Sequence, residues 1–203
     1  MPRKRYSRLP CPFPIKIKTL SLSSLCLIIG FALGAHFFDE PPPLVYQSPN
    51  GIQAQACFTP QHQCLPLILQ EIRKAKQEIL VQAYQLTSKP TAEALREAHE
   101  KGVTVKILAD KSQETNSHSQ IAFLAKAGID VLIDSKPRIA HSKIILIDRK
   151  TLIGGSYNYS EGAEKFNAEN VLILKNAPLI QEYLKNWEER YKVSRTPKIN
   201  LRN

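Results

Sequence analysis

The chain of 203 residues is long enough for one domain with a hydrophobic core and short for two. Its composition is that of an ordinary globular protein, which excludes a disordered or low-complexity chain. The formal net charge is +10, but six basic residues lie in 1–18 and five in 190–203, with no acid in either stretch. The other 17 basic residues nearly balance the 18 acidic ones, so the charge is weak evidence for a nucleic-acid-binding body.

Residues 1–38 have the layout of an export signal or an N-terminal membrane anchor. A basic stretch precedes the uncharged run 19–35, TLSLSSLCLIIGFALGA, and the first charges after it are Asp39 and Glu40. This bias of basic residues places the N-terminus in the cytoplasm. The run is slightly shorter than the ~20 residues of a spanning helix and lacks a clean A-x-A site, so cleavage and retention both stay open. We expect an exported protein, either periplasmic or anchored in the inner membrane and facing the periplasm.

Two cysteines, Cys57 and Cys64, follow this segment and flank the loop FTPQHQ. In an oxidising compartment, an even pair at this spacing favours a disulfide. A metal site that includes His62 is the alternative, but it lacks a fourth ligand and departs from the common zinc spacings. We therefore expect a disulfide and no metal, with two unpaired thiols as the remaining alternative.

The Pro-rich stretch 39–53 predicts a linker, 54–192 one folded domain, and 193–203 a basic C-terminal tail. Apolar periodicity within the domain predicts helices over 65–76, 90–101, 119–127 and 177–191, and strands over 78–84, 103–110, 129–134, 139–148, 151–158 and 167–175. Thr91 can open the second helix and Gly102 can close it. This order predicts an α/β domain with a mixed, mostly parallel sheet flanked by helices on both faces.

The densest cluster of reactive side chains lies between residues 141 and 169. His141 and Lys143 are two apart on a predicted strand, so their side chains share one face. An imidazole beside an ammonium is unfavourable on a buried strand unless an anion is present, and a phosphate is the natural anion. Lysine supplies charge, while histidine can attack phosphorus or transfer protons.

Residues downstream extend this pattern. Gly154 and Gly155 allow close backbone approach, and Ser156 and Asn158 alternate onto one face as neutral hydrogen-bond donors for phosphoryl oxygens. Glu169 enters on the next strand, where it can orient the imidazole through its Nδ1–H. The sequence therefore predicts a phosphate-handling site.

The chain resembles the phospholipase D superfamily through one HKD signature, His141-x-Lys143-x4-Asp148-x6-Gly155-Ser156-x-Asn158, followed by Glu169. The likeness is greatest to the single-motif subgroup of the bacterial periplasmic endonuclease Nuc and the mitochondrial Zucchini-type proteins. It covers roughly residues 54–192. It implies the α/β fold of that superfamily and a phosphodiester hydrolase.

The resemblance also implies residue roles. His141 would be the nucleophile that forms a phosphohistidine intermediate. Lys143 and Asn158 would hold the phosphate oxygens with help from Ser156, and Glu169 would fix the imidazole. No cofactor and no metal are implied.

Asp148 and Gly155 complete the motif, and we expect structural roles for both. Family members build an active site from two motifs, so that one histidine attacks while the other protonates the leaving oxygen. This chain carries one full signature. The resemblance therefore implies a homodimer in which two copies of His141 face one phosphate about a twofold axis, without metal dependence.

The substrate stays open among three readings. Small size and a single motif favour a non-specific endonuclease on DNA or RNA. A phospholipase D-type lipid phosphodiesterase at the membrane is the alternative, and a catalytically silent, membrane-anchored binding module is the third. Elsewhere we expect Tyr157 and Tyr159 to pack, Trp187 to lie in the core, and Asp110 to be solvated at the end of its strand.

Overall fold

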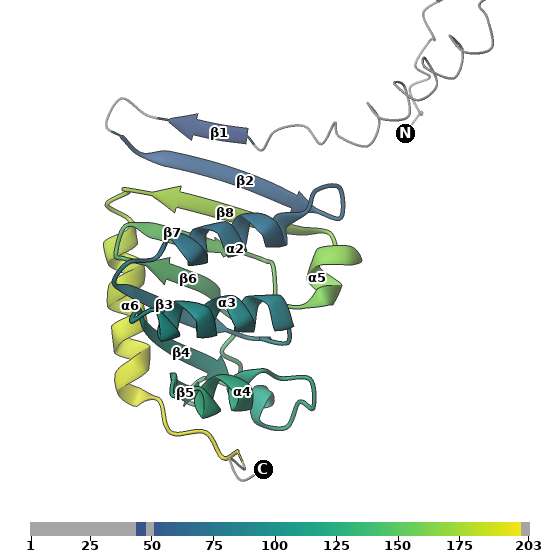
Figure 1. The fold of residues 1–203 in the computed structure, drawn as a ribbon, viewed down its shortest axis with the longest axis vertical. Coiled ribbons are helices and arrows are strands. Elements are labelled where there is room, and N and C mark those ends of the chain that lie inside the picture. Colours follow the sequence, from purple (N-terminus) through teal and green to yellow (C-terminus); the bar gives the residue numbers. More distant parts are fainter. Residues whose placement is uncertain (1–43, 48–50, 200–203) are drawn as a thin grey trace, which may run out of the picture. The chain divides into compact units, whose positions relative to one another are not determined.

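A computed structural model describes residues 44–47 and 51–199, which form an eight-stranded sheet with helices against both faces (Figure 1). The strands lie in the order β1-β2-β8-β7-β6-β3-β4-β5. Their bounds are β1 (Leu44–Gln47), β2 (Gln53–Thr59), β3 (Glu78–Ala83), β4 (Thr104–Asp110), β5 (Asp130–Asp134), β6 (Lys143–Ile147), β7 (Thr151–Gly155) and β8 (Glu169–Lys175). The helices are α2 (Cys64–Lys74), α3 (Lys89–Glu100), the 3-10 helix η1 (Lys111–Glu114), α4 (Ile121–Lys126), α5 (Glu161–Lys165) and α6 (Ile180–Val193).

The sheet is mixed and covered on both faces, so the predicted fold class is confirmed. The expected majority of parallel neighbours is wrong. Among the described strands, β3–β4 and β4–β5 pair in parallel and the other five neighbouring pairs are antiparallel. Parallel neighbours need a crossover, which α3 and α4 supply. β6 and β7 are instead joined by a tight turn through Asp148 and Arg149, whose φ angles of 50° and 56° suit a hairpin.

Two apolar layers hold the sheet. Ile79 and Val81 of β3 face α2, α3 and α4, while Leu80 between them faces α6, as the alternation of a strand requires. The larger cluster fills the space under the three helices, and the smaller one joins α6 to the opposite face. Trp187 of α6 is buried as expected, and its Nε1 donates to the Val81 carbonyl at 3.2 Å.

The folded unit extends beyond the predicted 54–192 at both ends. β1 lies inside the stretch 39–53 that was expected to be a linker, and it pairs antiparallel with β2. At the other end, Arg195 exchanges two backbone hydrogen bonds with Ile133, at 2.7 and 3.0 Å, and its guanidinium pairs with Glu114. The start of the predicted tail therefore lies along β5. The sequence analysis missed both contacts because it assigned 39–53 from its proline content and 193–203 from its positive charge.

Local boundaries differ from the sequence prediction where side chains decide them. Ser88 caps α3, because its Oγ accepts from the Thr91 amide at 3.3 Å; Thr91 itself lies inside the helix. Gly102 follows the helix end with a φ of +88°, as expected. β6 begins at Lys143, so His141 precedes the strand and does not lie on it. The short α5 and η1 were not predicted, because helices of under two turns carry no periodicity.

Cys57 of β2 and Cys64 at the start of α2 form the expected disulfide, with Cα atoms 5.7 Å apart. Both sulfurs are joined to each other, so the metal arrangement with His62 is not the one found. The bond ties the strand that precedes Thr59 to the first turn of α2.

The predicted export segment 1–38 lies outside the described residues. Among the residues that the structure does describe, no helix is long and apolar enough to cross a bilayer.

Candidate active site

The candidate site lies at one edge of the sheet, where strands of opposite direction end and begin. β3, β4 and β7 end at this edge, and β6 and β8 start there. Ala83, the last residue of β3, pairs with Lys143, the first residue of β6. This topology brings together side chains that are far apart in the sequence, from residue 84 to residue 169.

His141 and Lys143 are in contact. The Lys143 Nζ lies 3.0 Å from His141 Nδ1 and 3.1 Å from Nε2, and it donates to the His141 carbonyl at 2.8 Å. The His141 ring packs against Tyr84 with centroids 4.5 Å apart, and the Lys143 Nζ lies 5.2 Å from the Tyr84 centroid. An ammonium has no acceptor, so a hydrogen bond to the ring needs an unprotonated nitrogen, the form that can attack phosphorus.

The two side chains differ in exposure. His141 is exposed, whereas Lys143 is 5% exposed. Burial lowers the pKa of Lys143, and the nearby charge of Glu169 opposes that shift. Within the described part of the chain, no carboxylate forms an ion pair with Lys143. A buried ammonium without a paired anion is unfavourable, so this edge of the sheet favours an anionic ligand.

Ser156 and Glu169 form a second polar group beside the first. The Ser156 Oγ donates to Glu169 Oε2 at 2.5 Å and accepts from the backbone N and Nδ2 of Asn170, at 3.1 and 3.2 Å. The other Glu169 oxygen accepts from Asn167 Nδ2 at 2.9 Å. The expected hydrogen bond between Glu169 and the imidazole of His141 is not among these contacts.

Gly155 and Asn158 complete the turn after β7. Gly155 has a φ of +145°, and an added Cβ would lie 2.2 Å from the Asn170 carbonyl oxygen, so only glycine fits. The Asn158 Oδ1 is buried without a hydrogen-bond partner among the described residues. Buried polar atoms are nearly always paired, so this acceptor oxygen needs a donor such as a water molecule, while the Nδ2 of the same amide is the atom that can donate to an anion.

Asp148 lies at the opposite edge of the sheet from the rest of the motif. Its carboxylate accepts from the backbone amides of residues 76–78, at 2.8, 2.8 and 3.0 Å. Asp148 is five residues after Lys143, which amounts to ~17 Å at the usual rise of a strand. Asp148 therefore fastens the α2–β3 connection to the β6–β7 turn and cannot contact a phosphate at His141.

Asp110 is a site residue that the sequence analysis misjudged as solvated. It is 3% exposed, and its carboxylate accepts from the Ala140 amide at 2.7 Å and the Ser112 amide at 2.9 Å. Burial alone raises the pKa of Asp110, but these hydrogen bonds and the charge of Lys111 outweigh it, and the net shift is downward. Because Ala140 precedes His141, Asp110 fixes the approach of the histidine. Its place at the carboxyl end of a buried strand was the available signal.

Thr59 was not recognised from the sequence either. Its Oγ1 accepts from the Glu169 amide at 3.2 Å and lies 2.8 and 2.9 Å from the carbonyl oxygens of Ala163 and Asn167. This buried hydroxyl links the start of β8 to α5 and holds Glu169 in place. A threonine at a strand end has no distinctive sequence signal, because its partners lie more than one hundred residues away.

Tyr157 and Tyr159 pack inside the domain as expected, at 3% and 2% exposure. Tyr157 donates to Glu164 Oε2 at 2.9 Å, and burial together with that contact raises its pKa. The Tyr159 carbonyl accepts from the amides of Thr87 and Ser88, at 2.9 and 2.8 Å. These bonds tie the chain after β3 to the chain after β7.

The donor set of this edge suits an anion. Lysine, serine and asparagine donate to oxygen, and they are not the carboxylate-rich ligand set of a divalent cation. Among the described residues, no group of three or more His, Cys, Asp or Glu side chains is placed to hold a metal ion.

Comparison with known proteins gives the family. A family model described as cardiolipin synthase, PLD-like domain, matches residues 68–191, more than half of the chain. The chain belongs to the phospholipase D superfamily. The matched range of this phospholipase D-like domain contains the whole signature from His141 to Glu169. Family, relatives and solved structures together support a phosphodiester hydrolase.

Relatives of the domain carry lipid-related names. A protein named phospholipase D from Rickettsia typhi is 43% identical over 134 residues, which cover 66% of this chain and 66% of that protein. Its namesake from Rickettsia bellii is 41% identical over 184 residues, which cover 82% of this chain and 92% of that protein. A mouse protein named mitochondrial cardiolipin hydrolase is 30% identical and is covered over 64% of its length. The match thus spans about two thirds of the R. typhi and mouse proteins.

Two solved structures share the fold. Nuc from Salmonella typhimurium, described as a phospholipase D family member, superposes with a TM-score of 0.67 at 33% identity, over 71% of this chain and 97% of Nuc. NucT from Helicobacter pylori gives a TM-score of 0.65 over 70% of this chain and 98% of its own, and at 21% identity it shows the fold alone. The resemblance to this superfamily is therefore confirmed.

Proposed function

We propose that this phospholipase D-like domain is a metal-independent endonuclease that cleaves DNA or RNA through a phosphohistidine intermediate and acts as a homodimer. One observation carries the proposal: the buried Lys143 ammonium lies within 3.1 Å of both nitrogens of the exposed His141. A phosphodiester can reach the exposed imidazole from solvent while its oxygens lie against the ammonium. The charge of the ammonium stabilises the extra negative charge that develops on those oxygens during attack.

The reaction has two displacements. An imidazole nitrogen of His141 attacks phosphorus, so a P–N bond forms as the P–O bond to the leaving ester oxygen breaks. That oxygen takes a proton from His141 of the partner subunit. A water oxygen then attacks phosphorus and gives its proton to the same second imidazole, and the P–N bond breaks to free the first. Protons and bonds balance to one hydrolysis.

The neighbouring side chains serve the same phosphate. We assign Ser156 and Asn158, which both lie on the turn after β7, as phosphate ligands. The Asn158 Nδ2 can donate to a phosphate oxygen, and the Ser156 hydroxyl can do so once its proton leaves Glu169. Glu169 is a positioning residue, because it accepts from Ser156 and its charge favours the ammonium form of Lys143. The orienting hydrogen bond that the Glu169 carboxylate would accept from the imidazole N–H remains an expectation that the resemblance to the family implies.

A second subunit is required because one chain holds one motif. The sequence has another His-x-Lys pair, His99 and Lys101, but no Gly-Ser-x-Asn string follows it. That pair lies at the end of α3, beside the start of β4 and away from the edge that carries His141. The proton donor for the leaving oxygen therefore comes from a second copy of the chain.

The sheet offers an apolar surface for that copy beside the site. Phe58 of β2 and Leu172 of β8 are 48% and 43% exposed, on the face that α6 covers only farther along the sheet. Asn170, on the same face, contacts Ser156. Leu172→Glu is expected to give a monomer in analytical ultracentrifugation and to lose activity. Leu179→Glu, at the start of α6, is the matched control and should stay dimeric; a fully active Leu172→Glu monomer would refute the dimer.

Nucleic acid is the proposed substrate. Support comes from the likeness to Nuc at 33% identity over nearly its whole length, and from the single motif. A lipid phosphodiesterase is the second candidate, favoured by relatives named phospholipase D and cardiolipin hydrolase. The names describe those proteins, and the experiment below separates the two substrates.

Export is also part of the proposal. The segment 1–38 supports it from the sequence, and the disulfide between Cys57 and Cys64 fits an oxidising compartment. Maleimide labelling in intact cells tests it: Cys57 and Cys64 should react only after reduction. Labelling of both without reductant would place the domain in a reducing compartment.

The deciding experiment is a parallel assay of the purified protein in EDTA on single-stranded DNA, double-stranded DNA, RNA and phosphatidylcholine vesicles. His141→Ala is the control. Nucleic-acid cleavage that survives EDTA and disappears in His141→Ala supports the proposal. Cleavage of lipid alone assigns a phospholipase, and binding without turnover of any substrate assigns a silent module.

A further inference from the structure

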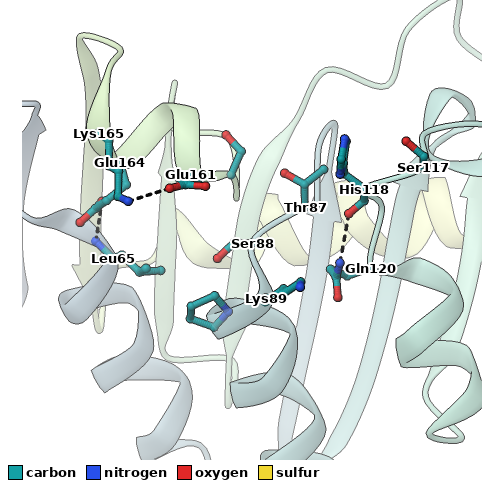
Figure 2. Close-up of a pocket in the computed structure, with 12 residues that line it drawn as sticks. Leu65, Thr87, Ser88, Lys89, Ser117, His118, Gln120, Glu161, Glu164 and Lys165 are labelled. Atoms are coloured by element: carbon teal, nitrogen blue, oxygen red, sulfur yellow. Dashed lines mark hydrogen bonds and ion pairs between the residues drawn. The ribbon is translucent and has the colours of Figure 1, made fainter.

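A large open pocket lies beside the candidate site, on the helix side of the same sheet edge. Its volume is about 780 Å³, within the range of small-molecule and substrate pockets. Figure 2 shows its walls: the start of α3 with Thr87 and Ser88 in the middle, the segment around His118 on one side, and α5 on the other. Of the twelve lining residues, only Leu65 and Pro90 are apolar.

Each wall is formed by the chain that follows one of the strands ending at the candidate site. The chain runs from Tyr84 to Ser88 on one wall and from Asn158 to Ser160 on another. The two are joined where the Thr87 and Ser88 amides donate to the Tyr159 carbonyl. Two residues of chain span at most ~7 Å, so the pocket begins about one nucleotide step from Asn158.

The third wall comes from the chain after Asp110. Leu86 anchors it, since its amide donates to the buried Gln113 Oε1 at 3.1 Å and its carbonyl accepts from the Gln120 amide at 2.9 Å. His118 is also fixed through its backbone, with its amide bonded to Asn116 Oδ1 and its carbonyl to Gln120. The pocket is therefore a built feature of the sheet edge.

Some charged side chains of the pocket already have hydrogen-bond or ion-pair partners, and others have none. On the α5 side, Glu161 pairs with Lys165 at 2.6 Å, and Glu164 accepts from the Leu65 amide and Tyr157. Within the described residues, neither the Lys89 ammonium nor the His118 ring has a hydrogen-bond or ion-pair partner. Figure 2 shows His118 near Thr87 and Ser117, and Lys89 lower in the pocket between Ser88 and Gln120, while Glu161 and Glu164 lie on the opposite side.

We propose that this pocket is a second phosphate subsite, in which Lys89 and His118 bind the phosphodiester that flanks the scissile one in a polynucleotide strand. The inference rests on the proposed function and narrows its substrate to a polymer. Ammonium, imidazole and hydroxyl groups together match a phosphate and a sugar. A diacyl lipid has no second phosphodiester to place in this pocket while its scissile phosphate lies at His141.

The test compares a short oligodeoxynucleotide with bis-p-nitrophenyl phosphate, a small diester that cannot reach the pocket while its phosphate lies at His141. For Lys89→Ala, the ratio of kcat/KM on the oligonucleotide to that on the small diester is expected to fall about tenfold, the usual loss for a hydrogen bond to a charged group. His118→Ala should lower the same ratio. Lys185→Ala, an exposed lysine on α6, is the matched control and should leave the ratio unchanged.

The salt dependence of oligonucleotide binding is a second measurement, and a merely structural effect of Lys89→Ala would leave it unchanged. Oligonucleotide binding to the His141→Ala protein weakens linearly with the logarithm of salt concentration. Adding Lys89→Ala is expected to reduce that slope by about 0.7, the value for one phosphate contact on a single strand. An unchanged slope would overturn the subsite.

Failures of the two proposals can be distinguished. If the protein cleaves the small diester with dependence on His141, and Lys89→Ala leaves the substrate ratio unchanged, the subsite is wrong and the phosphodiesterase stands. If Lys89→Ala lowers kcat/KM equally on cardiolipin vesicles and on oligonucleotides, the pocket binds a lipid headgroup and the polymer inference is overturned. Absence of hydrolysis of both test substrates by the folded protein removes the proposed function and this inference with it.

Discussion

Asp148 provides the sharpest test of how the signature divides into structure and chemistry. Its carboxylate makes three hydrogen bonds to backbone amides at 2.8–3.0 Å, and its own φ is +50°. Hydrogen bonds to a charged acceptor stabilise by about 1.5–3 kcal/mol each, and partial exposure reduces that. Asp148→Ala removes all three and places alanine in the left-handed region, so we expect a loss of roughly 2–4 kcal/mol in the free energy of unfolding.

Asp148→Asn is the matched variant, because asparagine tolerates a positive φ and keeps one carbonyl acceptor. It should lose about half as much stability. For a domain of this size, the alanine variant should melt on the order of 10 °C lower. Urea unfolding measures the loss of stability in each variant, and a thermal melt measures the shift in melting temperature.

Activity then separates the two roles. Asp148 is ~17 Å from Lys143 along β6, so the folded Asp148→Asn protein should keep a kcat on bis-p-nitrophenyl phosphate within about threefold of wild type at low temperature. A folded Asp148→Asn protein as inactive as His141→Ala would refute the structural assignment and require a direct part in chemistry.

Three further predictions follow from the same contacts. Asp110→Asn should lower kcat by more than it changes KM and cost about 1–3 kcal/mol of stability. The pKa of Asp110 is lowered in the folded state, so the wild-type protein has this extra stability above the unfolded pKa of about 3.9 and loses it as the pH falls through the folded pKa. In urea unfolding, the difference in free energy of unfolding between wild type and Asp110→Asn should therefore shrink as the pH is lowered. Gly155→Ala should abolish activity and destabilise the fold in thermal melts, whereas Gly154→Ala, whose Cβ would lie 3.5 Å from its nearest neighbour, should behave like wild type; equal losses would contradict the steric argument. Replacing Cys57 and Cys64 by serine should cost about 2 kcal/mol, because the disulfide closes a short loop with a sequence separation of 7. Wild type in reductant should melt like the double variant.

The sequence predicted the elements whose apolar period is long. Helices α2, α3 and α6 and the strands from β3 to β8 lie within a few residues of their predicted ranges, because the core stripe alone determines them. The sense of pairing was not predictable in the same way. It depends on whether a turn such as Asp148–Arg149 or a helix connects two strands, and four residues of β1 between prolines carry no period at all.

The candidate site was predictable where the signature has a fixed spacing. His141, Lys143, Ser156, Asn158 and Glu169 all lie at one edge of the sheet, although His141, Ser156 and Asn158 are in the turns beside the strands and not on them. The partners of Glu169 were not predictable, because its neighbours depend on the turn after β7 and on Thr59 of β2.

Asp110 illustrates the opposite limit. A lone aspartate at the end of a strand is ordinarily solvated. Asp110 is buried because the loop before His141 covers it, and that contact cannot be predicted from the sequence around Asp110. Lys89 and His118 are likewise separated in sequence, and the hydrogen bonds of Leu86 to Gln113 and Gln120 hold the two segments together at one pocket.

Trapping the covalent intermediate tests the central claim most directly. An oligonucleotide with radiolabel at the scissile phosphate is mixed with excess enzyme in EDTA and quenched in alkali, where a phosphohistidine survives. The account predicts transient label on the peptide that contains His141, and neither label nor cleavage with His141→Ala. Cleavage at the wild-type rate by His141→Ala, or turnover by wild type without label on that peptide, would contradict it.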